Sequence, residues 1–286
     1  MLKPIATGLI VLAALAGCDS RNPSAPAAGT AASNEAPAAA PQGVDAPIPS
    51  EITGTISLRE PAVINPGAKL SVQLVDVAQQ EVALATHNED LTSQPPYSFR
   101  LPMNPAGIDR TRVYVVNVEI TDGERHYTQA LQAPVLTGGA GSDIKIVLNA
   151  EATPGELLKA DFNKLKNHIG GMRRIQDAFL DGDLSVAWDG FVEPGNRLRF
   201  MRVNTELGEG DTAVRSNVEY AFLNDKPMAL LVKGRANSRL GWDENGQLIL
   251  NERGGGETFT PEEAQKYYDD AMKAFAMAQP KMPKKR

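Results

Sequence analysis

Apolar and polar residues alternate along much of the segment that follows residue 50. A repeat of two places the apolar side chains on one face of a half-buried β-strand. Five runs show this repeat, and a return strand over residues 124–131 is expected beside the fourth. The alternating apolar positions are Ile52, Ile56 and Leu58; Leu70, Val72 and Leu74; Tyr97, Phe99 and Leu101; Tyr114, Val116, Val118 and Ile120; and Ile144, Ile146 and Leu148.

Turn residues separate these runs. Asp122-Gly123 directly follows one run, and this dipeptide is a strong signal for a tight hairpin. Asn65-Pro66-Gly67 and Asn104-Pro105 separate other runs. Short, evenly spaced strands without intervening helices are typical of an antiparallel sandwich or barrel. We therefore predict an antiparallel β-sandwich domain over residues 51–150.

The pattern changes after residue 150. Thr153-Pro154-Gly155-Glu156 is a capping box with proline at the first helical position, and Gly170-Gly171 ends the helix that it predicts. Strand patterns return between residues 184 and 251. A second capping box, Thr260-Pro261-Glu262-Glu263, begins a closing helix. Residues 151–279 are thus predicted to form an α+β module (helix, antiparallel meander, helix), so the chain as a whole is mainly β.

The start of the chain has the features of an export signal. Lys3 precedes an apolar stretch over residues 5–15, which is too short to span a bilayer as a helix. The following Leu15-Ala16-Gly17-Cys18 resembles the lipobox of bacterial lipoproteins. The resemblance implies that residues 1–17 are a signal peptide cut after Gly17 and that Cys18 receives a thioether-linked diacylglycerol. Acylation of the new amine is left open. A buried core cysteine in a cytosolic protein is the alternative interpretation.

Two segments are predicted to lie outside the folded domains. Residues 18–50 carry the lipid anchor and a linker with six prolines, ten alanines and no aromatic residue. Such a composition buries too little apolar surface to offset ordering, so we expect a disordered linker. Residues 280–286 form a basic tail, for which contact with anionic headgroups and a solubilising role are both open.

A family resemblance covers residues 52–149. The residues that carry it are Gly54-Thr55-Ile56-Ser57-Leu58-Arg59-Glu60, Pro66-Gly67-Ala68, Leu70 to Val77, Pro96-Tyr97-Ser98-Phe99, Leu101-Pro102, Asn104-Pro105, Ile108-Asp109, Tyr114-Val115-Val116, Ile120-Thr121-Asp122-Gly123 and Pro134-Val135-Leu136-Thr137-Gly138-Gly139. This segment resembles the YbaY/YscW-type lipoprotein domain. That family is similar to type III secretion pilotins, which are small lipoproteins that escort or stabilise secretin rings. The resemblance implies an envelope lipoprotein that faces the periplasm, with a protein partner such as a secretin.

The residue after the cysteine bears on which membrane holds the protein. Asp19 resembles the signal that retains enterobacterial lipoproteins in the inner membrane. A pilotin must instead reach the outer membrane. The sequence therefore predicts a lipid-anchored protein of the bacterial cell envelope and leaves the choice of membrane open.

Composition and motifs favour a protein without catalysis. A net charge of −6 argues against a nucleic-acid-binding protein, which needs a clustered basic surface. The three histidines have no ligand spacing for a metal, and the chain has no nucleophile elbow, phosphate loop or HExxH string. We predict no cofactor, no metal and no enzymatic activity, and instead a binding or assembly factor. The alternative is a hydrolase or small-ligand-binding protein with its site in the C-terminal domain.

One strand carries a candidate anion site. Arg197, Arg199 and Arg202 are interleaved with Leu198 and Phe200. On the open face of a sheet, their guanidinium groups are suited to hold phosphate or carboxylate bidentately. A solvated sheet face is the alternative interpretation.

Overall fold

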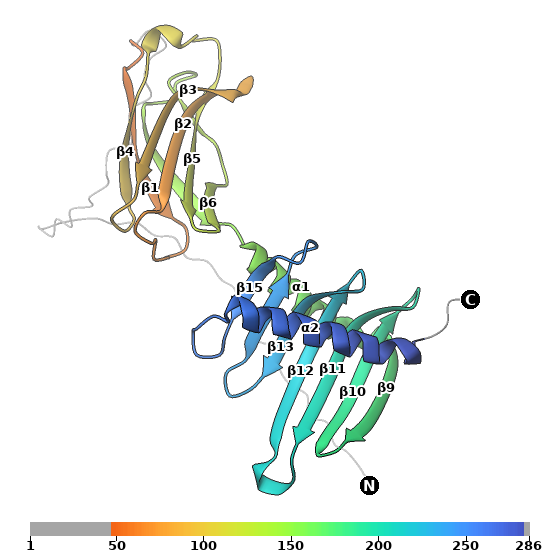
Figure 1. The fold of residues 1–286 in the computed structure, drawn as a ribbon. Helices are drawn as coiled ribbons and strands as arrows, with labels where there is room; N and C mark the ends of the chain where they lie inside the picture. Colours follow the sequence, from red (N-terminus) through yellow and green to blue (C-terminus); the bar gives the residue numbers. More distant parts are fainter. Residues whose placement is uncertain (1–46, 283–286) are drawn as a thin grey trace, which may run out of the picture. The chain divides into compact units, whose positions relative to one another are not determined.

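The computed structural model describes residues 47–282. These residues form two β-sheets and two α-helices, so the prediction of a mainly β protein is confirmed (Figure 1). The first sheet encloses one hydrophobic cluster, and the second sheet packs with the two helices in two others. Among the described residues, no helix is both long and apolar enough to cross a bilayer.

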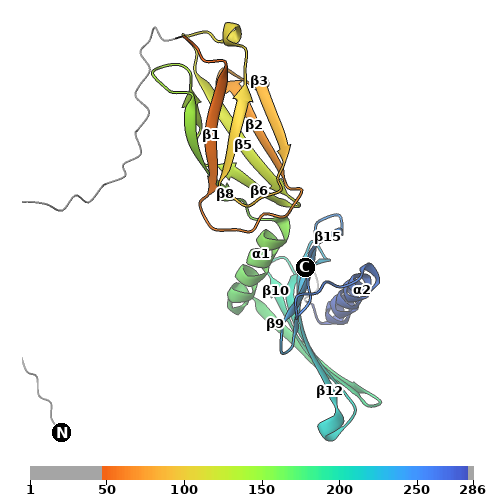
Figure 2. The same cartoon turned by 90° about the vertical axis from the view of Figure 1, so that its left-hand side faces the viewer.

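The first sheet has eight strands that curl into a nearly closed barrel (Figure 2). Its order is β3-β2-β5-β6-β8-β1-β4, and β7 pairs with β5. The strands are β1 (Glu51–Leu58), β2 (Lys69–Asp76), β3 (Gln79–Asp90), β4 (Tyr97–Pro102), β5 (Tyr114–Asp122), β6 (Arg125–Gln129), β7 (Ala133–Val135) and β8 (Asp143–Ala150).

One pair of strands departs from the antiparallel expectation. β1 and β8 run parallel, with Gly54 opposite Ile144, whereas the other pairs of this sheet are antiparallel. Their backbones approach closely at Gly54. A Cβ atom there would lie 2.5 Å from the carbonyl oxygen of Ile144 and 2.7 Å from the ring of Phe99. This position needs glycine because no side chain fits between the strand and the core.

The second sheet is an antiparallel meander, as predicted. Its strands follow one another in chain order from β15 to β9. They are β9 (Arg173–Asp181), β10 (Leu184–Glu193), β11 (Arg197–Leu207), β12 (Val214–Leu223), β13 (Lys226–Lys233), β14 (Ser238–Trp242) and β15 (Leu248–Glu252).

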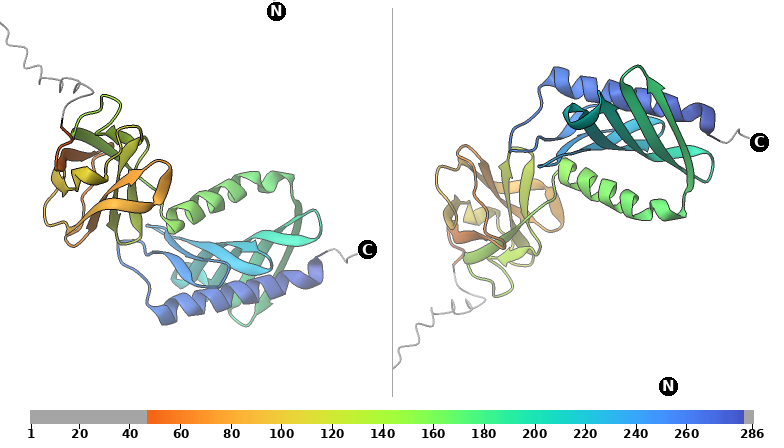
Figure 3. Two further views of the ribbon diagram at one scale, coloured as in Figure 1. Left: turned by 90° about the horizontal axis from the view of Figure 1, so that it is seen from above. Right: turned by 90° about the horizontal axis from the view of Figure 1, so that it is seen from below.

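Two helices cover opposite faces of this meander (Figure 3). α1 (Pro154–His168) precedes the sheet, and α2 (Pro261–Ala278) follows it. Both begin at the predicted capping boxes, where Thr153 pairs with Glu156 and Thr260 with Glu263. Successive strand residues alternate between the two helices because side chains alternate across a sheet. Leu230, for example, packs in the cluster with α2, whereas Leu231 packs in the cluster with α1.

Candidate functional site

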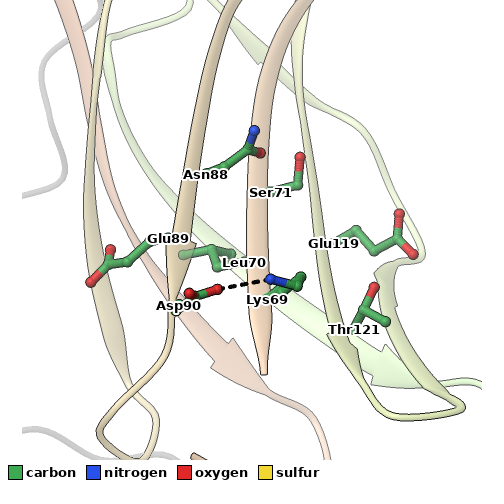
Figure 4. A pocket seen from close by; sticks show the side chains of 8 residues that line it. All are labelled: Lys69, Leu70, Ser71, Asn88, Glu89, Asp90, Glu119 and Thr121. Carbon is green, nitrogen blue, oxygen red and sulfur yellow. Dashed lines mark hydrogen bonds and ion pairs between the residues drawn. The ribbon is translucent and has the colours of Figure 1, made fainter. Parts of the chain in front are cut away.

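A hollow of about 510 Å³ lies on the outer face of the first sheet, over β2, β3 and β5 (Figure 4). Leu70, Val72 and Leu74 of β2 point into the core, so the residues between them point outward. The hollow is lined by Lys69, Leu70, Ser71, Asn88, Glu89, Asp90, Glu119 and Thr121. Figure 4 shows Glu89 directed away from the other polar side chains.

A second hollow of about 230 Å³ extends the first one along the same face toward β6. The two share Ser71 and Glu119, so they form one depression, which we call the polar groove. Its polar side chains come from four strands: Lys69, Ser71 and Gln73; Asn88 and Asp90; Asn117, Glu119 and Thr121; and Thr128 and Gln129.

Side-chain contacts engage the charged groups of the groove. Lys69 Nζ lies 3.1 Å from Asp90 Oδ1, and His126 Nδ1 lies 2.5 Å from Glu119 Oε1. The Thr128 hydroxyl donates to Glu151 Oε1 over 2.7 Å. The remaining groups are hydroxyls and amides, which both donate and accept hydrogen bonds. This surface is suited to bind a polypeptide backbone and its polar side chains.

The groove adjoins a free strand edge. β3 ends the order of the first sheet, and β2 is its only paired strand among the described residues. The first half of β3 is exposed throughout, with Val82 60% and Leu84 44% accessible. An exposed edge with apolar side chains is a template for pairing with another chain. The exposed apolar residues lie in the first half of β3, whereas the groove is lined by Asn88 and Asp90 near the end of that strand.

The three arginines of the predicted anion site do not form a free row. Arg197 Nε lies 2.9 Å and Arg199 Nη1 3.3 Å from Glu193 Oε1. A β-bulge shifts the register, since Phe191 pairs with Phe200 and Val192 with Leu198. As a result, Leu198 packs toward α2 and Phe200 toward α1.

The face that was expected to be open is covered in part. The Phe162 ring of α1 lies 5.7 Å from the ring of Phe200. Arg202 lies on the same face, with its guanidinium carbon 5.4 Å from the centre of the Phe191 ring. Each guanidinium thus already faces a carboxylate or an aromatic ring, and anion binding by these residues stays a prediction.

Arg202 belongs to a charge cluster around Glu219, which sequence reasoning missed. Glu219 is only 1% exposed. Its carboxylate lies 2.6 Å from Lys166 Nζ, 2.7 Å from Lys233 Nζ and 3.6 Å from Arg202 Nε. Burial raises the pKa of Glu219, and hydrogen bonds from Lys166 and Lys233 more than reverse that effect, so the pKa lies below its usual value. The cluster fastens α1 to the sheet. The sequence does contain a sign of this buried charge, because the glutamate interrupts the apolar run from Val218 to Phe222.

The other predicted site residues, Gly17, Cys18 and Asp19, lie outside the described residues. Within residues 47–282, no group of three or more metal-ligating side chains is arranged to hold a metal ion.

Residues 48–148 match the model of one protein family. It is the family of type III secretion system lipoprotein chaperones (YscW). The match confirms the resemblance seen in the sequence, and it covers the first sheet with its polar groove. It ends before α1, so the second sheet and both α-helices lie outside it.

One solved structure is also similar to the chain. It is described as an alternative pilotin from the type II secretion system of Vibrio cholerae. The two chains are 24% identical over 36% of this chain and 96% of the pilotin, with a TM-score of 0.34. No curated protein matches the chain.

Proposed function

We propose that this protein is a lipid-anchored, periplasm-facing lipoprotein that acts as a binding and assembly factor of the cell envelope, without catalysis. Its partner is a secretin or a similar ring-forming envelope protein. The observation that carries the proposal is the match of residues 48–148 to the lipoprotein chaperones of the YscW family. The lipobox-like segment ending at Cys18 supports the anchor.

The polar groove and the free edge of β3 supply the binding surface in this proposal. An extended partner segment would hydrogen-bond to the β3 edge through its backbone and place alternate side chains over the groove. Ser71 is central because it lines both hollows. An arginine there would project a long charged side chain into the groove.

The test is secretin assembly in the bacterium that carries the gene. Deletion is expected to reduce the detergent-resistant secretin multimers seen on immunoblots, and the wild-type gene is expected to restore them. A Ser71→Arg gene should fail to restore them. Thr55→Arg, on an exposed position of β1 outside the groove, is the matched control and should succeed. Unchanged multimers after deletion would contradict the role in secretin assembly.

The membrane that holds the anchor is tested separately. Asp19 directly after Cys18 favours inner-membrane residence, which competes with the secretin role because a pilotin must reach the outer membrane. Sucrose-gradient fractionation should place the wild type in the inner membrane and Asp19→Ser in the outer membrane. A wild type already in the outer membrane, with no change on substitution, would remove the retention hypothesis and strengthen the pilotin-like role.

A further inference from the structure

A separate hollow lies at one end of the second sheet, outside the family match. It is bordered by α1 and by the turns of the β12–β13 and β14–β15 hairpins, and its volume is about 360 Å³. That size falls within the usual range of small-molecule sites. Leu158, Met228, Trp242 and Ile249 contribute apolar surface.

The walls of this hollow are held in place from several sides. Gly155 of α1 approaches so closely that a Cβ atom there would lie 2.6 Å from the carbonyl oxygen of Ile249. Lys159 Nζ, on the same helix, lies 2.9 Å from Glu252 Oε1. Asp243 Oδ1 accepts hydrogen bonds from the backbone N–H groups of Asn245 and Gln247, at 2.9 and 2.7 Å. The hollow is therefore formed before any ligand enters, which lowers the entropy lost on binding.

The charges at the rim are unbalanced. Asp161, Asp243 and Glu244 contribute three carboxylates, and Lys226 is the one cation among the lining residues. Lys226 Nζ donates to the backbone carbonyl of Glu244, at 3.4 Å, rather than to a carboxylate. The Asp161 side chain makes no hydrogen bond or ion pair with other residues in the described part of the chain. An acidic rim above an apolar floor disfavours anions and favours cations that carry an apolar group.

We propose that this hollow binds a small organic amine with an apolar body, the ammonium group lying toward Asp161 and the hydrocarbon or aromatic part against Met228 and Trp242. This proposal concerns only the hollow beside the second sheet and does not depend on the envelope role proposed for the first sheet. Asp161 acts as the counter-ion of the amine, and the apolar surface contributes the hydrophobic part of the affinity.

Tryptophan fluorescence provides the measurement. The chain has two tryptophans, Trp188 and Trp242, so Trp188→Phe leaves the one that lines the hollow. Residues 18–286 with Cys18→Ser, which cannot be lipidated, would be titrated with three probes of similar size. These are 2-phenylethylamine, 2-phenylethanol and 3-phenylpropionate.

The amine is expected to change Trp242 emission and to bind about tenfold more tightly than the carboxylate, with the alcohol between them. Asp161→Asn should remove most of that preference while leaving the alcohol unaffected. Glu262→Gln, which removes an exposed carboxylate from the first turn of α2, is the matched control and should leave all three affinities unchanged. Equal affinities for amine and carboxylate, no binding of the amine, or an Asp161→Asn protein with an unchanged preference would each overturn the proposal.

Discussion

Replacing Glu219 with glutamine should destabilise the second sheet strongly. The substitution keeps the shape of the side chain and removes its charge. Lys166, Lys233 and Arg202 would then converge on a neutral amide. Because Glu219 is 1% exposed, water cannot replace the lost carboxylate at the centre of the cluster.

The size of the expected loss in unfolding free energy follows from how deeply Glu219 and its three cationic partners are buried. Removing one partner of a fully buried ion pair costs about 3–5 kcal/mol. The three cations here are 31%, 35% and 41% exposed, so each can turn partly toward solvent. We therefore expect the free energy of unfolding to fall by about 2–3 kcal/mol at pH 7.

The pH dependence gives a second, independent criterion. Burial raises the pKa of Glu219, but hydrogen bonds from Lys166 and Lys233 bring it below the ordinary value of 4.5. A lowered pKa in the folded state stabilises the protein above the unfolded pKa, and this contribution disappears as the pH falls through the folded pKa. The difference between wild type and Glu219→Gln should therefore shrink below pH 4.5.

Urea unfolding followed by tryptophan fluorescence measures this effect. Trp188 and Trp242 both lie in the core of the second sheet, so the signal reports on that sheet. Glu206→Gln is the matched control, since Glu206 pairs with Arg215 on an exposed part of the same sheet. This control should lose less than about 1 kcal/mol. A Glu219→Gln protein as stable as that control, or a difference that stays constant down to pH 3.5, would refute the reasoning.

Three further outcomes are expected. Gly241→Ala would place a Cβ atom against Leu158 of α1 and should lower the free energy of unfolding by about 1–3 kcal/mol in the same urea assay. Gly170→Ala is the control and should be nearly neutral, because a Cβ atom there would meet open space. Residues 51–150 alone should fold, because their core cluster contains only their own side chains; a helical or disordered far-UV circular dichroism spectrum would contradict this. Cys18→Ser should leave the membrane fraction and stay uncleaved by signal peptidase II, and membrane binding like that of the wild type would rule out the anchor.

The strands that sequence patterns did not reveal are mainly edge strands. β3 and β9 lie at the ends of their sheets, and most of their residues are exposed. A strand without a buried face has no need for alternating apolar residues, so its sequence carries no period-two signal. The same reason applies to the polar groove. Its residues lie on an outer face, and only the strand order β3-β2-β5-β6 brings them together.

Local signals determined the elements that depend on a few neighbouring residues. Both capping boxes formed where Thr153 and Thr260 predicted them, and Asp122-Gly123 joins β5 to β6. These features arise within one turn of chain, where a side chain and the backbone that it binds are a few residues apart.

Only the tertiary structure decided which distant elements meet. The parallel pairing of β1 with β8 joins residues about 90 positions apart, and the Glu219 cluster collects side chains from α1, β11, β12 and β13. No local sequence pattern predicts these contacts, because the free energy that stabilises them comes from surface that two elements bury together rather than from either element alone. In the sequence, Glu219 is therefore only an exception within an apolar strand. The structure explains it, because Lys166 of α1 forms an ion pair with its carboxylate.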